Sequence, residues 1–136
     1  MQVDAFLADD AEAVNGKIYV LGGGVDRHYV PKGFEPPIQL RADMAIGIYT
    51  ARQMIYHTAW CRDQKQRVTQ QAAMCKVYCS EMVNRVADSA LQIHGGMGYM
   101  KESPIERVYR DMRLYRIFEG TSEVQRMVIA RELLKD

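Results

Sequence analysis

Hydrophobic positions beyond residue 37 recur every three or four residues, which is the spacing of one face of an α-helix. In the stretch from about residue 38 to 66, the recurring positions are Met44, Ile48, Ala51, Ile55 and Ala59. From about residue 69 to 94, they are Cys75, Cys79, Met82, Val86, Ala90 and Ile93. The spacing predicts two long helices, each with one apolar stripe.

Two shorter helices are predicted from their start signals. Ser103, Pro104 and Glu106 combine an N-cap serine, a proline at the first helical position and a glutamate three residues after the cap. A fourth helix begins at Thr121 or Ser122, either of which can cap it, and runs nearly to the last residue. The connection "HGGMGYMKES" is too irregular to continue a helix. We expect a mainly α fold, an antiparallel helical bundle in which the first two helices are antiparallel and the fourth packs against them.

The first 33 residues follow a different pattern. Val3, Ala5 and Leu7 alternate along an extended stretch, and Asn15-Gly16 is a hairpin signal followed by the strand-like "KIYVLGGG". The prolines and glycine of "VPKGFEPP" then break any regular element. The sequence therefore predicts two units: a β-hairpin-like segment over residues 1–33 and a helical domain over residues 38–136.

Composition and charge narrow the class of protein. The 136 residues suffice for about one domain, and a formal net charge of +1 gives no reason to expect nucleic acid or an anionic membrane as a partner. No apolar run approaches the roughly 20 residues of a membrane span, and no signal peptide is evident. We expect a cytoplasmic protein without a membrane span.

The sequence has three cysteines, Cys61, Cys75 and Cys79. Their odd number and helical spacing argue against a disulfide framework and for a reducing compartment. Cys75 and Cys79 share one helix face and would suit a metal site, but no other ligand stands at a supporting spacing. We favour the alternative, two small core residues, and expect no metal.

Two glycine-bearing turns are candidate ligand sites. The helix start at Thr121-Ser122-Glu123 is a prepared anion site with added hydroxyls, and "QIHGGMG", from Gln92 to Gly98, lets a ligand approach the backbone. Together they suggest a ligand with phosphates. The alternative is a helix C-cap at Gly95 followed by a plain loop, which spacing alone slightly favours.

Glu119 lies between an apolar pair and a glycine, ahead of the cap of the fourth helix. This placement would suit a buried general base, whereas the commoner alternative is a solvated loop carboxylate. His57 and His94 are the other titratable candidates. His57 has no evident partner in its helix, and His94 joins the glycine turn.

The stretch "ALQIHGGMGYMKESPIERVYRDMRLYRIFEGTSEVQRMVIARELL" closely resembles the C-terminal signature of the acyl-CoA dehydrogenases. That family consists of FAD-dependent enzymes that introduce an α,β double bond into acyl-CoA thioesters. The Gln-Ile-x-Gly-Gly-x-Gly-Tyr and Glu-Gly-Thr-Ser-Glu-x-Gln-Arg motifs both match in order and spacing. "ADMAIGIYTARQMIY" resembles the preceding helix, so the resemblance covers about residues 38–136.

The resemblance assigns roles to the residues of both turns. It implies that Glu119 is the catalytic base, that Phe118 and Gly120 contact substrate, and that the Glu119 backbone N–H polarises the thioester carbonyl. It also implies two sets of FAD contacts. The first set is Thr121, Ser122 and Glu123. The second set, which reaches FAD across a subunit interface, is Gln92, Ile93, His94, Gly95 and Gly96. The implied partners are acyl-CoA, a second copy in a homodimer or dimer of dimers, and electron-transfer flavoprotein as electron acceptor.

The resemblance leaves part of the family pattern unmatched. The family's preceding α-helical and β-barrel domains, and a long helix ending in Arg-x-x-Phe-Gly, have no counterpart in this sequence. Residues 1–33 match none of them. We therefore expect a truncated C-terminal domain that performs FAD-dependent dehydrogenation only with a partner supplying the other flavin walls. The alternative is a non-catalytic helical module for oligomerisation or interaction.

Overall fold

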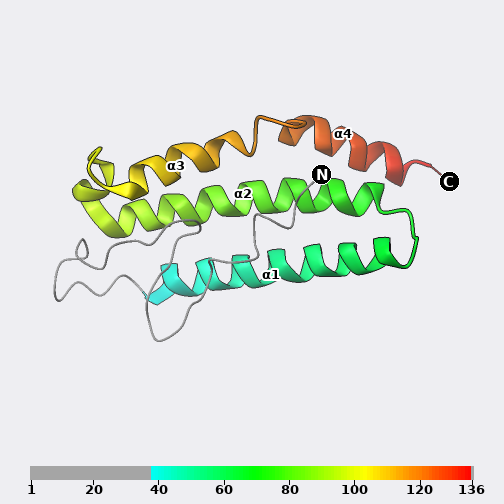
Figure 1. Cartoon of the computed structure of the whole chain (residues 1–136), viewed down its shortest axis with the longest axis horizontal. Coiled ribbons are helices and arrows are strands. Elements are labelled where there is room, and N and C mark those ends of the chain that lie inside the picture. Colours follow the sequence, from blue (N-terminus) through cyan, green and yellow to red (C-terminus); the bar gives the residue numbers. More distant parts are fainter. Residues whose placement is uncertain (1–37, 136) are drawn as a thin grey trace.

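The computed structural model describes residues 38–135 and consists there of helices and their connections (Figure 1). The elements are α1 (Ile38–Asp63), α2 (Thr69–His94), the short 3₁₀-helix η2 (Gly95–Tyr99), α3 (Pro104–Leu114) and α4 (Ser122–Leu133). The predicted mainly α fold is confirmed for this part of the chain. The predicted β-hairpin over residues 1–33 lies outside the described residues.

The long helix α2 is the centre of the fold. Figure 1 shows α1 antiparallel to α2 along one side, and α3 and α4 end to end along another. Within residues 38–135, α1 and α4 each pack on α2 and not on each other. The prediction that the fourth helix packs against both long helices is therefore wrong, because α2 separates α4 from α1.

The apolar stripe of α2 forms the main core with α1. Its members Cys75, Met82, Val86, Ala90 and Ile93 are buried with Met44, Ala51 and Ile55 of α1 and with Ile105 of α3. Cys79 is half-buried beside this cluster. The predicted stripe of α2 is confirmed in its positions.

A second face of α2 is also buried, which the single stripe did not predict. It consists of the small residues Ala73, Ser80, Val83 and Ala87. At 3.6 residues per turn these positions lie on the same side as Lys76 and Asn84, whose side chains bond to the segment between residues 112 and 120. Small side chains on this face allow the α3–α4 segment to approach α2 closely.

The stripe of α1 ends differently from the prediction. Ala59 is exposed, whereas Thr58 is half-buried and its hydroxyl lies 3.3 Å from the Cys75 sulfur. The helical period explains the difference, because position 58 continues the line of Ala51 and Ile55 better than position 59 does.

Helix starts agree with the predicted boundaries but differ in their caps. Thr121 caps α4, since its hydroxyl oxygen accepts from the Val124 N–H at 3.3 Å. Helix α3 begins at Pro104 with Ser103 as N-cap, yet the serine side chain makes no capping hydrogen bond. The Glu106 carboxylate accepts from Arg110 at 2.9 Å and not from the Ser103 backbone N–H. The Ser103 and Glu106 side chains therefore do not form a capping box.

The glycine-rich connection after α2 is more regular than expected, because residues 95–99 form η2. Gly98 makes this possible. A Cβ atom there would lie 2.8 Å from the His94 Cβ and 2.9 Å from the Leu91 carbonyl oxygen, both closer than real contacts allow.

All three cysteines are free, and Cys61 and Cys75 are buried. Burial raises the pKa of the Cys75 thiol, and burial together with Cys75 raises the pKa of Cys79 to about 12. Cys75 is a core residue, as predicted, and Cys79 packs half-buried against the same core. Among residues 38–135, no cluster of three or more histidine, cysteine or acidic side chains is arranged to hold a metal ion. None of the helices described is both long and apolar enough to cross a membrane.

Candidate functional site

The connection between α3 and α4, residues 115–121, forms a tight turn that we call the Glu119 turn. Glu119 and Gly120 both have left-handed backbone angles, with φ of 51° and 87°. The Ser122 N–H donates to the Arg116 carbonyl at 3.1 Å and closes the turn. A non-glycine residue reaches such an angle only at an energetic cost that the surrounding structure must offset. The conformation of Glu119 is therefore imposed by its contacts.

Lys76 of α2 supplies the principal side-chain contact of this turn. Its Nζ atom donates to the carbonyl oxygens of Tyr115 at 2.8 Å and Gly120 at 2.6 Å, on either side of Glu119. The Gln125 amide adds a longer bond of 3.5 Å to the Glu119 carbonyl. The sequence pattern did not predict this role of Lys76. The available signal was a line of polar positions along one face of the helix, with Lys76, Ser80 and Asn84 four residues apart.

Charges around the turn are partly compensated. Burial lowers the pKa of Lys76, while the nearby carboxylates of Glu123 and Glu119 act in the opposite direction. The pKa of Glu123 is lowered first by a hydrogen bond from its own backbone N–H, then by the Thr121 hydroxyl and nearby arginines. Glu123 is thus held as a carboxylate at the start of α4, the end of a helix that favours negative charge.

A second acidic group ties the turn to both neighbouring helices. Glu81 of α2 forms ion pairs with Arg116, at 3.9 Å, and with Arg126 of α4. The guanidinium groups are partly exposed, so each pair contributes little by itself. Their arrangement nevertheless links α2 to both sides of Glu119.

Glu119 and Phe118 point away from the core. Both side chains are exposed, and the Phe118 ring packs edge-on against Tyr115 with ring centroids 5.0 Å apart. Of the two alternatives for Glu119, the structure shows the solvated loop carboxylate and not the buried one, because none of the described helices covers the turn. The Glu119 N–H makes no hydrogen bond within residues 38–135. A carboxylate, an aromatic ring and a free N–H donor thus lie on consecutive residues.

The other predicted cofactor residues lie at the end of α2. Gly95 has φ of 58° and its N–H donates to the Gln92 carbonyl, which confirms the C-cap interpretation. A Cβ atom on Gly95 or Gly96 would meet nothing within 4 Å, so the backbone there is open to a ligand. The Ile93 side chain is buried in the core, which leaves only its backbone for such a contact.

The two predicted cofactor segments do not meet in one chain. Lys76, beside the Glu119 turn, and Gln92 are sixteen residues apart on α2, or about 24 Å at the usual rise per residue. Each chain therefore presents two separate partial sites: one at the Glu119 turn and the start of α4, and one from Gln92 to Gly96 at the end of α2.

Each partial site keeps a buried polar atom without a partner. The Ser122 Oγ and the His94 Nε2 are both buried and make no hydrogen bond within the described part of the chain. His94 Nδ1 lies 2.7 Å from the Ala90 carbonyl and donates to it, so Nε2 is the ring nitrogen left without a partner. Ser122 stands in the first turn of α4, where N–H groups and the helix dipole favour a phosphate. These residues fit a ligand with phosphate and hydroxyl or amino groups, as FAD has.

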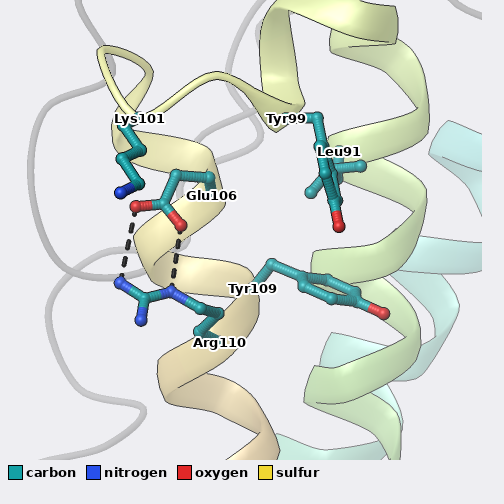
Figure 2. Close-up of a pocket in the computed structure, with 6 residues that line it drawn as sticks. All are labelled: Leu91, Tyr99, Lys101, Glu106, Tyr109 and Arg110. Atoms are coloured by element: carbon teal, nitrogen blue, oxygen red, sulfur yellow. Dashed lines mark hydrogen bonds and ion pairs between the residues drawn. The ribbon is translucent and has the colours of Figure 1, made fainter.

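A separate pocket of about 640 Å³ lies between the end of α2, η2 and α3 (Figure 2). Its lining residues are Leu91, Tyr99, Lys101, Glu106, Tyr109 and Arg110. Figure 2 shows the Tyr99 and Tyr109 side chains near Leu91, and the Glu106–Arg110 pair at the other side. Sequence periodicity did not predict this pocket, because its walls come from three elements.

Comparisons with known proteins agree with the motifs. The family model described as "Acyl-CoA dehydrogenase, C-terminal domain" matches residues 38–134. A probable acyl-CoA dehydrogenase, YngJ of Bacillus subtilis, is 54% identical over 94 residues, which are 69% of this chain and 25% of that protein. This chain therefore spans about a quarter of the length of that curated relative.

Solved structures give the same result for the fold. The crystal structure of acyl-CoA dehydrogenase from Geobacillus kaustophilus superposes with a TM-score of 0.68 and 37% identity, over 71% of this chain and 26% of that one. A structure described as the FAD complex of PigA superposes with a TM-score of 0.67 and 33% identity, over 70% of this chain and 25% of that one. The arrangement of the described helices is thus shared with larger proteins.

Proposed function

Since the chain belongs to the acyl-CoA dehydrogenase family through its C-terminal domain, we propose that it takes part in FAD-dependent α,β-dehydrogenation of an acyl-CoA thioester. The observation that carries this proposal is the Glu119 turn, where an exposed carboxylate and an N–H without a hydrogen bond to any described residue are held at a left-handed position. Electron-transfer flavoprotein is the proposed electron acceptor.

Glu119 acts in this proposal as the general base that removes the α-proton of the thioester. An α-proton is too weakly acidic for a carboxylate unless the developing enolate-like charge is stabilised as it forms. The N–H of Glu119 donates to the oxygen on which that charge develops. The Phe118 ring and Gly120 contact the acyl chain. Bound FAD would supply the acceptor for the β-hydrogen, which leaves the substrate as hydride.

The proposed FAD contacts come from both partial sites. Thr121, Ser122 and Glu123 bind from the start of α4, where Ser122 Oγ has no partner within residues 38–135. Gln92 to Gly96 bind from the end of α2 of another subunit, where the buried His94 Nε2 has no partner among the described residues. The distance between the segments along α2 supports this division between subunits.

An exposed stripe on α1 supports self-association. Ile46, Tyr49, Tyr56 and Trp60 recur at helical spacing on the side away from α2, and between 55% and 67% of each residue is exposed. Apolar patches of this kind are usually covered by a partner. We propose a second copy as that partner, because a homodimer would also unite the two partial sites.

The stripe gives a testable prediction. The full chain is expected to sediment as a dimer or larger species at about tens of micromolar, and Tyr56→Glu with Trp60→Glu is expected to shift it to monomer. Two added carboxylates on each subunit would then have to be desolvated at the interface. Leu134→Glu, which is also exposed but lies outside the stripe, serves as the control. A monodisperse wild-type monomer would contradict the proposal.

The proposed function is tested by flavin retention. The purified chain is mixed with FAD, alone and with a fragment of a family member that supplies the domains preceding this one, and then passed through gel filtration. Yellow protein that reduces a dye when acyl-CoA is added supports the proposal. Colourless protein in both mixtures would favour the alternative, a non-catalytic oligomerisation or interaction module.

A further inference from the structure

Side chains of α2 add hydrogen bonds at the C-terminal end of α3, where the Met112, Arg113 and Leu114 carbonyls also accept from backbone N–H groups of residues 115–118. The last carbonyls of a helix have no partner within the helix and need one from elsewhere. The Asn84 amide donates to the Met112 carbonyl at 2.7 Å, and Lys76 donates to the Tyr115 carbonyl at 2.8 Å. Two side chains on one face of α2 thus fix where α3 ends and the Glu119 turn begins.

Lys76 also binds the far side of the turn. Its 2.6 Å bond to the Gly120 carbonyl joins the residue after Glu119 to the same ammonium group that holds Tyr115. The two carbonyls flank the left-handed Glu119, so one cation bridges the residues that impose its backbone angle. Without the ammonium, both carbonyl oxygens would lose a charge-assisted bond, which is stronger than a neutral one.

The position of Lys76 is unusual for a lysine that only provides solubility. It is half-buried among apolar residues of α2, next to the buried Cys75, and lysine is rarely withdrawn from water without partners. Its ammonium is also close enough to interact with the carboxylates of Glu119 and Glu123. Packing alone would be served as well by an apolar side chain of similar length.

We propose that Lys76 is a positioning residue for the Glu119 turn: it holds the catalytic carboxylate and the neighbouring N–H in their working arrangement from α2. The part that concerns catalysis rests on the proposed function. The part that concerns the turn conformation rests on the contacts of this chain alone. The two can be measured separately.

The first measurement is amide hydrogen exchange by NMR on the full 136-residue chain, without cofactor. The Phe118 and Ser122 amides report on the turn, because their bonds of 3.0 Å and 3.1 Å exist only when it is formed. Lys76→Met is expected to speed their exchange about tenfold, the equivalent of losing one net hydrogen bond of roughly 1.4 kcal/mol. Lys76→Arg, which keeps charge and donors, is expected to restore most of the protection.

Two outcomes of this measurement would overturn the proposal. Unchanged exchange at Phe118 and Ser122 in Lys76→Met would show that the turn does not need the ammonium. Equal acceleration at core amides such as those of Val86 and Ala90 would make Lys76 a general stabiliser. Arg85→Met, an exposed basic residue of the same helix, is the matched control and should leave every amide unchanged.

The second measurement applies to a preparation with acyl-CoA-dependent dye reduction. Lys76→Met is expected to lower kcat about tenfold or more with KM changed less than twofold, and Lys76→Arg is expected to recover most of the rate. Loss of substrate affinity with unchanged kcat would contradict a positioning role. If the wild type has no activity, the proposed function fails, and the exchange result still decides whether Lys76 holds the turn.

Discussion

Glu119→Gln is expected to reduce acyl-CoA-driven dye reduction by about two to four orders of magnitude, the usual contribution of a general base. The substitution preserves the size and planarity of the side chain but removes its basic oxygen. FAD retention is expected to be unchanged, because the proposed cofactor contacts lie at Thr121 to Glu123 and at Gln92 to Gly96. The measurement compares dye reduction and bound flavin in wild type and variant.

Glu123 is the neighbouring carboxylate that would have to replace Glu119. Its pKa is lowered by its backbone N–H and by Thr121, which makes it a weaker base at the same pH. Glu102→Gln, at an exposed carboxylate before α3, provides the control and should retain full activity. If Glu119→Gln loses flavin together with activity, Glu119 is a structural residue. Unchanged activity would place the base elsewhere.

Ile105→Ala is expected to lower the free energy of unfolding by about 2–5 kcal/mol, the range for truncating a fully buried aliphatic side chain. Ile105 is only 1% exposed and is the member of the main core that α3 contributes. Its methyl group lies 3.4 Å from the position of a Cβ on Gly98, so η2 and α3 meet at this side chain. Truncation would leave a cavity where α2, η2 and α3 join.

Urea unfolding followed by circular dichroism measures this effect. Leu134→Ala, at a residue that is 83% exposed, is expected to change the free energy by less than about 0.5 kcal/mol. A loss below about 1 kcal/mol in Ile105→Ala would mean that the junction relaxes around the missing atoms. Such a result would argue against a close-packed connection between η2 and α3.

The helices were predictable where local signals agree. The second helix spans Thr69–His94 as predicted, because its apolar period is unbroken and glycines follow it directly. Pro104 and the Thr121 cap fix two further starts, since backbone geometry and capping are local properties. Neighbouring residues thus contain enough information to determine these boundaries.

The contacts between distant helices and the arrangement of the two partial sites were less predictable than the helix boundaries. Lys76 binds Tyr115 and Gly120, which lie 39 and 44 positions later in the sequence, and no local pattern indicates such a contact. The sequence left open whether Glu119 is buried or exposed, because its exposure depends on what lies over the turn rather than on its sequence. The separation of the two partial sites follows from the direction in which α3 and α4 return along α2, which helical spacing does not specify.

The isolation of α1 has a consequence for cooperativity. In the described part of the chain α1 packs on α2 alone, while the Glu119 turn is fixed from a different face of the same helix. Local unfolding of α1 would therefore remove one wall of the main core and spare the bonds of Lys76 and Asn84. Regions with few partners open at lower free energy than the rest of a protein. We expect α1 to behave as a separate foldon, with the Glu119 turn belonging to the more persistent unit of α2, α3 and α4.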